Sequence, residues 1–250
     1  MNSVVTRTWS SVLFDLDGTI LDSAPGIIDA LTDTFEHLGL PVPTREDFMA
    51  YIGPPLLASL QERAGLSEEK AREALAIYRN DFRRDGAFDS AIFPGVIGLL
   101  DSLRDAGVPL AIATSKPETQ ARPILDHFGL TDYFTVIAGA SEDDARTSKA
   151  HVVGHALAEL SKAGADTSHA VLIGDRIYDV EGAAAHNVPT IIVEWGYGSP
   201  TEAAGAIATV YSADRLRELL LSYVKERPLL PLQSETLLVQ SNGMKHWLTL

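Results

Sequence analysis

Residues 11–19 read SVLFDLDGT, a short apolar run that ends in two aspartates, one residue apart, and a glycine. Side chains alternate between the two faces of an extended strand, so Asp15 and Asp17 project to one side and Leu16 to the other. Two carboxylates held this close repel each other unless a cation lies between them. Because Mg²⁺ prefers oxygen ligands of this kind, the stretch predicts a magnesium site at the end of a buried strand.

The composition is that of an acidic chain large enough to enclose a hydrophobic core. Of its 250 residues 46% are hydrophobic and 22% charged, and the formal net charge is −14 at pH 7. This charge disfavours nucleic acid as a partner, since phosphate backbones bind to basic surfaces. The absence of cysteine excludes disulfides and zinc–thiolate sites. Without a membrane-length apolar run or a secretory signal, we expect a cytoplasmic protein with no membrane partner.

The order of predicted elements indicates an α/β fold with a helical insert. After the first strand, apolar residues at helical spacing predict four helices between about residues 24 and 90. Continuous apolar strands then alternate with helices, and such strands are typical of a parallel sheet covered on both faces. The predicted strands lie at 110–113, 134–138, 170–173, 190–193 and, more weakly, 209–211. One predicted helix runs to Phe128, and Pro123 should kink or shorten it. Another covers residues 216–223.

These elements divide the chain into three parts. We expect residues 1–22 and 92–226 to form the α/β core and residues 23–91 to form the helical insert. Residues 227–250 do not continue the alternation of helix and strand, and they are treated as a C-terminal extension to which no role is assigned.

Further polar side chains follow the later strands. Thr114 and Ser115 come after the strand at 110–113, while Asp175 follows the strand at 170–173 and Asp179 lies one helical turn further on. Since ligands of open parallel sheets collect at the carboxyl ends of the strands, we expect these side chains beside the first aspartate pair. The carboxylates would complete an oxygen-rich Mg²⁺ site, and Thr114 with the turn after it would suit an anion.

Each of these features has a simpler interpretation when it is taken alone. A threonine and serine after a strand are most often capping residues, and a glycine and aspartate there are commonly a turn. Lys149 begins a predicted helix, where position alone favours a solvated side chain. Lys116, Arg176 and His186 lie near the same strand ends and are expected to be solvated, without a chemical role.

Taken together and in this order, the motifs resemble those of the haloacid-dehalogenase-like superfamily. The resemblance covers roughly residues 11–223, with FDLDGT at 14–19, Thr114, Lys149 and GDRIYD at 174–179 as its four motifs. The segments FPGV at 93–96 and WGYG at 195–198 resemble the phosphoglycolate-phosphatase-like branch. The resemblance implies a three-layer Rossmann-like core with the insert as an α-helical cap domain of the C1 type.

The resemblance also implies a Mg²⁺-dependent phosphatase that hydrolyses a small phosphorylated metabolite, such as a phosphoglycolate-like compound, a nucleotide or a sugar phosphate. Asp15 would attack phosphorus to give an aspartyl-phosphate, and Asp17 would act as general acid and base. Thr114, Ser115 and Lys149 would hold the phosphoryl group. The metal ligands would be Asp15, the backbone carbonyl of Asp17, Asp175, and Asp179 as ligand or outer neighbour.

Several alternatives stay open. A sugar phosphomutase related to the β-phosphoglucomutases uses the same residues, and a catalytically idle phosphate-binding regulatory protein would keep the same fold. Dehalogenases and phosphonoacetaldehyde hydrolases of the superfamily lack an acid at the place of Asp17 and are disfavoured. Lys116 competes for the role of Lys149, which lacks a following proline. Gly53, Pro54 and Arg83 of the cap are candidate substrate contacts, and the oligomeric state is not predicted.

Overall fold

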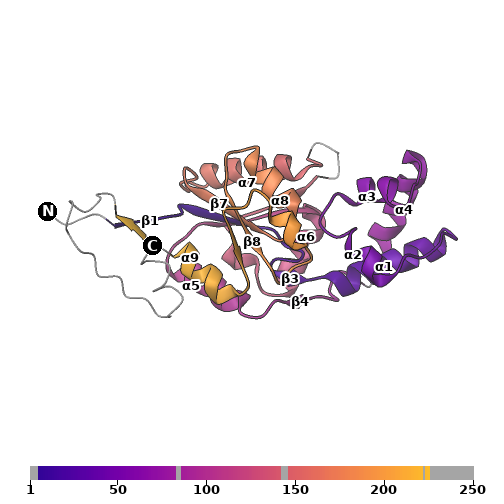
Figure 1. The fold of residues 1–250 in the computed structure, drawn as a ribbon, viewed down its shortest axis with the longest axis horizontal. Helices are drawn as coiled ribbons and strands as arrows, with labels where there is room; N and C mark the ends of the chain where they lie inside the picture. Colours follow the sequence, from indigo (N-terminus) through magenta and orange to yellow (C-terminus); the bar gives the residue numbers. More distant parts are fainter. Residues whose placement is uncertain (1–4, 83–85, 142–145, 222, 226–250) are drawn as a thin grey trace. The chain divides into compact units, whose positions relative to one another are not determined.

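The computed structural model describes residues 5–82, 86–141, 146–221 and 223–225. The chain divides into two units. In the smaller unit, β1 (Val5–Arg7) pairs antiparallel with β10 (Tyr223–Lys225). The larger unit is Thr8–Ser222 and contains the central sheet and the helices around it (Figure 1). The extension at 227–250 lies outside the described residues.

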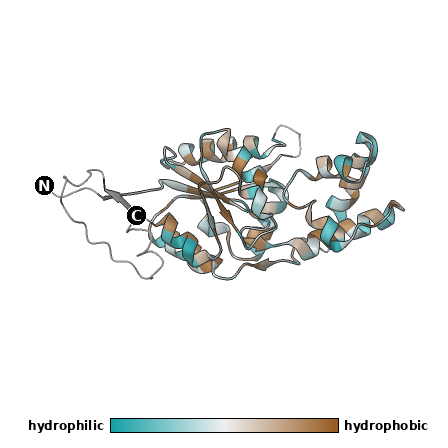
Figure 2. Cartoon of the chain, viewed as in Figure 1, coloured by the Kyte–Doolittle hydropathy of each residue, from teal (hydrophilic) through white to brown (hydrophobic). Residues whose placement is uncertain are grey.

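The centre of the larger unit is a sheet of six parallel strands, which confirms the predicted α/β class. Their order is β6 (Val136–Ala140), β5 (Leu110–Pro117), β2 (Ser11–Phe14), β7 (Ala170–Gly174), β8 (Thr190–Val193) and β9 (Ala208–Val210). Every residue of β2, β7 and β8 is buried, as continuous apolar runs predict. Figure 2 shows hydrophobic residues along these strands.

The sheet is covered on both faces, so the fold has three layers. Val12 and Phe14 of β2 lie in one hydrophobic cluster, which includes α5 (Val96–Asp105) and α9 (Ala213–Leu220). Leu13, on the opposite face of the same strand, lies in a second cluster with α7 (Lys149–Lys162). Figure 1 shows α7 and α8 (Ile177–Ala184) on one side of the strands and α5 and α9 on the other.

Two helices differ from the sequence prediction. α6 (Glu118–His127) continues through Pro123, and its buried residues, which include Ala121 and Leu125, lie on the face that packs against β5 and β6. α9 ends before Tyr223, which belongs to β10, and it starts earlier because Ser212 caps it by accepting a hydrogen bond from the Arg215 N–H.

The helical insert begins and ends at a short antiparallel strand pair. β3 (Leu21–Asp22) pairs with β4 (Ala91–Ile92), with Leu21 opposite Ile92 and Asp22 opposite Ala91. Between them, the described residues form α1 (Ala24–His37), α2 (Arg45–Met49), α3 (Leu56–Glu62) and α4 (Glu68–Asp81), as predicted. Among the described helices of the chain, none combines the length and hydrophobicity that a bilayer crossing would demand.

Candidate active site

The first aspartate pair lies at the carboxyl end of the central strand. Asp15 follows β2 directly, is 5% exposed, and donates its backbone N–H to the Ile173 carbonyl of β7 at 2.8 Å. Asp17 lies two residues further on and is partly buried. Gly18 then turns the chain with φ of +82°, and a Cβ at this position would collide with the carboxylate of Asp175. The glycine therefore allows the two segments to approach each other.

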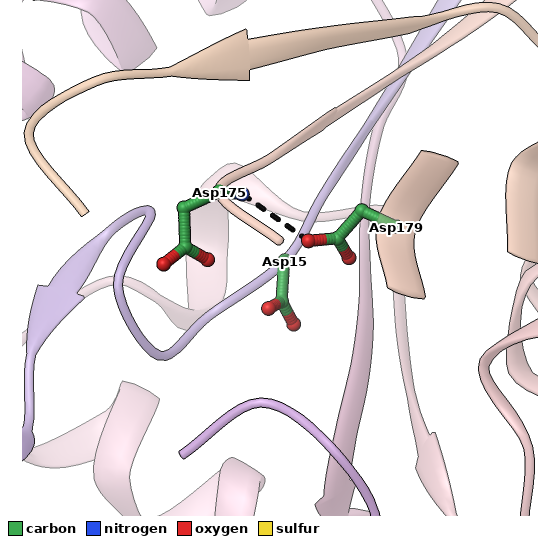
Figure 3. A group of neighbouring side chains, drawn as sticks. All are labelled: Asp15, Asp175 and Asp179. Carbon is green, nitrogen blue, oxygen red and sulfur yellow. Dashed lines mark hydrogen bonds between the residues drawn. The ribbon is translucent and has the colours of Figure 1, made fainter. Parts of the chain in front are cut away.

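Three carboxylates converge beside this turn. One oxygen from each of Asp15, Asp175 and Asp179 lies within 4.8 Å of the others, and all three residues are buried (Figure 3). Asp175 follows β7, and Asp179 lies in the first turn of α8. The Oδ2 atom of Asp179 accepts hydrogen bonds from the N–H groups of Asp175 and Arg176 at 3.1 and 3.0 Å. The predicted carboxylate cluster is thus present, with Asp179 fixed by the backbone of its own turn.

The electrostatics of the cluster favour a cation. Burial, and then the charges of Asp179 and Asp15, raise the pKa of Asp175 well above its usual value. Burial also raises the pKa of Asp179 to about 6, with Lys149 opposing the shift and Asp15 adding to it. Lys149 pairs with two of the three carboxylates, so negative charge remains in excess in the cluster. Hard oxygen donors with excess negative charge suit Mg²⁺, and Asp15, Asp175 and Asp179 therefore fit this ion.

Lys149 connects two members of the cluster. Its Nζ atom lies 2.8 Å from Oδ1 of Asp15 and 2.6 Å from Oδ1 of Asp179. Burial lowers the pKa of Lys149, but the two carboxylates raise it more, so the pKa rises overall and the side chain stays charged. Gly182 of α8 makes room for the lysine, because a Cβ there would lie 2.6 Å from Lys149 Cγ. The expectation from position alone, a solvated lysine, is wrong.

Lys116 serves the other aspartate. Its Nζ atom lies 3.1 Å from Oδ2 of Asp17, and the Ser23 hydroxyl donates to Oδ1 of Asp17 at 2.6 Å. The ammonium also lies 4.5 Å from the centre of the Phe82 ring in the helical insert. Thr114 is buried, and its hydroxyl accepts a hydrogen bond from the Lys116 N–H at 3.2 Å. Lys116 is 8% exposed, so the prediction that it is solvated is wrong.

Arg176 is likewise buried rather than solvated. Its Nε atom donates to Oε2 of Glu202 at 2.7 Å, and its guanidinium also donates to the carbonyl oxygen of Ile52 in the insert. Burial raises the pKa of Glu202, but the contacts with Arg176 and the hydrogen bonds from the N–H groups of Ser199 and Ile177 together lower it by more, so the pKa lies below its usual value and the pair stays ionised. His186 is exposed, as expected. Because the partners of Arg176 lie 26 and 124 residues away, no local signal in the sequence identifies them.

A cavity of about 650 Å³ lies between the first aspartate pair and the helical insert. On the side of the sheet it is lined by Asp15, Asp17, Thr114, Ser115 and Lys116. The insert contributes mainly apolar residues, including Tyr51, Ile52, Gly53, Pro54, Leu57, Leu75 and Tyr78. The candidate contacts Gly53 and Pro54 therefore line the cavity, while Arg83 lies outside the described residues.

The comparison with known families accounts for this arrangement. A model of the haloacid dehalogenase-like hydrolases matches residues 12–193, which include the carboxylate cluster, Thr114 and both lysines. The chain belongs to the haloacid dehalogenase-like hydrolase family. Its six-stranded parallel sheet and helical insert are those expected from the resemblance.

Three curated relatives of this haloacid dehalogenase-like hydrolase carry different names. Tyrosine-protein kinase PtkA of Mycobacterium tuberculosis is 45% identical over 213 residues, 84% of this chain and 72% of that protein. A solved structure of PtkA has a TM-score of 0.74 at 42% identity and covers 86% of this chain and 98% of that one. A 5'-nucleotidase of Pseudomonas aeruginosa is 36% identical over 217 residues, 86% of this chain and 97% of the relative.

The third relative is a phosphoglycolate phosphatase of Agrobacterium fabrum. It is 33% identical over 190 residues, which are 74% of this chain and 80% of the relative. The resemblance of this haloacid dehalogenase-like hydrolase to the phosphoglycolate-phosphatase-like branch is thereby confirmed.

Proposed function

We propose that this chain is a phosphoric monoester hydrolase that requires Mg²⁺ and works through an aspartyl-phosphate on Asp15. The observation that carries the proposal is the unequal environment of two neighbouring carboxylates. Both line the cavity, but Asp15 lies in the buried cluster with Asp175 and Asp179, whereas Asp17 is held outside that cluster by Ser23 and Lys116. Such an arrangement suits one carboxylate to nucleophilic attack and the other to proton transfer.

The reaction has two displacements at phosphorus. A carboxylate oxygen of Asp15 bonds to phosphorus while the bond between phosphorus and the leaving oxygen breaks, and Asp17 gives a proton to that oxygen. Asp17 then takes a proton from water as the water oxygen bonds to phosphorus. The bond between phosphorus and Asp15 breaks, which releases inorganic phosphate, frees the Asp15 carboxylate and leaves Asp17 protonated as at the start.

The remaining site residues bind and neutralise charge. Asp15, Asp175 and the backbone carbonyl of Asp17 would hold Mg²⁺, with Asp179 as a ligand or as the partner that orients Lys149. Bound Mg²⁺ offsets the repulsion between the nucleophile and the phosphate. Thr114, Ser115 and Lys149 would hold the oxygens of the phosphoryl group.

The cavity supports a substrate class. Its volume of about 650 Å³ falls within the roughly 300–1,000 Å³ of pockets that bind drug-sized molecules. This favours leaving groups of the size of a sugar or a nucleoside over the much smaller glycolate. Two of the three relatives are named as phosphatases of small metabolites, a 5'-nucleotidase and a phosphoglycolate phosphatase.

The first experiment measures phosphate release by the purified full chain from p-nitrophenyl phosphate, with Mg²⁺ and with EDTA. Asp15→Asn is expected to lose at least on the order of 10³-fold in kcat, because the nucleophile is removed. Turnover in EDTA, or full activity of Asp15→Asn, would sink the mechanism. A panel of nucleoside monophosphates, sugar phosphates and phosphoglycolate then ranks the substrates by kcat/KM.

The same assays separate the alternatives. A phosphomutase would interconvert hexose phosphates with little free phosphate, so product and phosphate are quantified together. An idle phosphate-binding protein would turn over nothing in the panel, although it would have no need for the proton-transfer group Asp17. Since one relative is named a tyrosine kinase, the chain is also incubated with ATP and a tyrosine peptide, and phosphotyrosine is measured.

A further inference from the structure

The segment WGYG at 195–198 has no part in the reaction above, yet it contacts the site in several places. The indole N–H of Trp195 donates to the carbonyl oxygen of Thr19 at 3.1 Å. The backbone N–H of Tyr197 donates to Oδ2 of Asp175 at 2.7 Å. A Cβ at Gly196 would collide with Gly18 and Asp175, and one at Gly198 with the Asp175 carbonyl. The two glycines therefore permit the segment to lie against the turn that carries the aspartates.

The hydroxyl of Tyr197 reaches the start of the helical insert. It accepts hydrogen bonds from the N–H groups of Ser23 and Ala24 at 2.7 and 3.0 Å. It donates to Oδ1 of Asp22 at 2.9 Å. The first N–H groups of a helix have no partner within the helix, so an acceptor from elsewhere must satisfy them. Tyr197 thus supplies the acceptor for the beginning of α1.

Ser23 lies at the same helix start, but its side chain does not cap the helix. It is the N-cap of α1, and a serine there commonly accepts a hydrogen bond from the second or third helical N–H. In this chain its side chain makes no capping hydrogen bond and instead donates to Oδ1 of Asp17 at 2.6 Å. The donors that such a cap would accept are not available, because Pro25 has no N–H and the Gly26 N–H donates to the Asp89 carbonyl at 3.2 Å. The Ser23 hydroxyl is therefore left for the carboxylate of Asp17, while the Tyr197 hydroxyl fixes the backbone of Ser23.

We propose that Tyr197 is a positioning residue for proton transfer: its hydroxyl fixes Asp22, Ser23 and Ala24 so that the Ser23 hydroxyl holds the Asp17 carboxylate toward the leaving oxygen. The inference rests on the function proposed above, in which Asp17 protonates that oxygen. Lys116 holds the other oxygen of Asp17 at 3.1 Å, so the carboxylate is fixed from two sides. One side belongs to the sheet and the other to the first residues of the insert.

The test compares two substrates that differ in their need for a proton. The leaving group of an alkyl phosphate such as glycerol phosphate is a strongly basic alkoxide, which needs a proton. The leaving group of 2,4-dinitrophenyl phosphate is a phenolate that is stable as an anion and needs none. The ratio of their kcat/KM values reports proton transfer in the first displacement. General acid catalysis contributes roughly 10²–10⁴-fold, so Asp17→Asn is expected to lose about that factor with the alkyl phosphate alone.

Tyr197→Phe removes only the hydroxyl, and Ser23→Ala removes the hydrogen bond to Asp17 directly. Both are expected to lose about tenfold in kcat/KM for the alkyl phosphate, a part of the general-acid factor, and less than about twofold for the aryl phosphate. Tyr133→Phe is the matched control, because its hydroxyl also binds a carboxylate, Asp101 at 2.8 Å. It is expected to behave as the parent chain with both substrates.

The outcomes distinguish the inference from the proposed function. If Asp17→Asn shows the selective loss but Tyr197→Phe and Ser23→Ala do not, the inference is wrong and the phosphatase mechanism stands. Equal losses of both variants on the two substrates would also overturn it, since they would place the effect on Asp175 or on the fold. If Asp17→Asn shows no selective loss of kcat/KM for the alkyl phosphate, the proposed role of Asp17 is wrong, and the inference that depends on it is wrong as well. Ser23→Ala decides the matter if Tyr197→Phe does not fold.

Discussion

Asp15 and Asp17 are the same residue type, two positions apart, and their neighbours separate them. Asp15 shares Lys149 with Asp179, and Asp17 is held by Lys116 and Ser23. Each of these two carboxylates therefore has its own cation, Lys149 from the first residue of α7 for Asp15 and Lys116 from β5 for Asp17. The two lysines that compete for one role in the sequence thus occupy distinct positions in the structure.

Removal of Lys149 should be costly to stability. Lys149→Met leaves the buried Asp15 and Asp179 without their shared cation, and loss of one partner from a buried ion pair typically costs about 3–5 kcal/mol. We expect a decrease of this size in the free energy of unfolding, measured by urea denaturation in EDTA, and a smaller decrease with Mg²⁺ present.

The control is Lys162→Met at the other end of the same helix. Lys162 is 72% exposed and pairs with Glu159 on the surface, so its loss should change stability by less than about 1 kcal/mol. Equal effects of the two substitutions would contradict a structural role for the Lys149 contacts.

At the residue scale, the sequence could predict the members of the site that belong to local motifs. Asp15, Asp17, Asp175 and Asp179 follow strands whose apolar runs are visible in the sequence, and the structure brings their segments together. The partners of Arg176 could not be predicted, since a buried arginine is defined by residues that only the fold brings near it.

At the scale of elements, the strands with long apolar runs could be predicted from the sequence, and the two-residue strands could not. The runs in β7 and β8 are buried throughout and appear where expected. β3 and β4 have two residues each, too few to produce any periodicity. α9 ends before the predicted Tyr223, because Tyr223 pairs with Arg7, some two hundred residues earlier in the chain, and helical spacing carries no information about such a partner.

Two glycines within helices should respond to alanine in opposite directions. Gly182 of α8 faces Lys149, and a Cβ there would lie 2.6 Å from its Cγ, so Gly182→Ala should destabilise the protein by about 1–3 kcal/mol. Gly98 of α5 is exposed with open space at its Cβ position, so Gly98→Ala should stabilise by up to about 1 kcal/mol. Thermal unfolding of both variants measures the contrast, and a loss of stability in each would refute it.

At the scale of the whole molecule, Mg²⁺ should stabilise the fold. A ligand that binds only the folded state adds about 2.7 kcal/mol when its concentration is 100 times Kd. We expect the unfolding temperature to rise with Mg²⁺ and to return to its starting value with EDTA. Asp175→Asn should abolish the increase, and Asp105→Asn, a surface carboxylate paired with Arg104, should retain it. An unchanged increase in Asp175→Asn would remove that carboxylate from the metal site.

The contact of Arg176 with Ile52 should hold the insert near the sheet. We expect Arg176→Gln to increase hydrogen exchange at Ile52 and Gly53, measured by mass spectrometry, because the Ile52 carbonyl loses its donor. Glu202→Gln should act in the same direction more weakly, since it weakens the ion pair that orients Arg176. The control Arg122→Gln changes an arginine that pairs with Glu118 on the surface, and it should leave exchange near Ile52 unaltered. If hydrogen exchange in β7 increased as much as at Ile52 and Gly53, the substitution would have destabilised the fold as a whole, and the prediction would be wrong.

The β3–β4 pair has a consequence for how such a chain can be altered. Because Asp22 lies opposite Ala91, the two ends of the insert are neighbours in space although some seventy residues separate them in sequence. The entropy of closing a loop grows only with the logarithm of its length, so what is attached at this point matters little to the folding of the sheet. Inserts of different length can therefore be exchanged beyond this junction, provided that Ser23, which contacts Asp17, is kept.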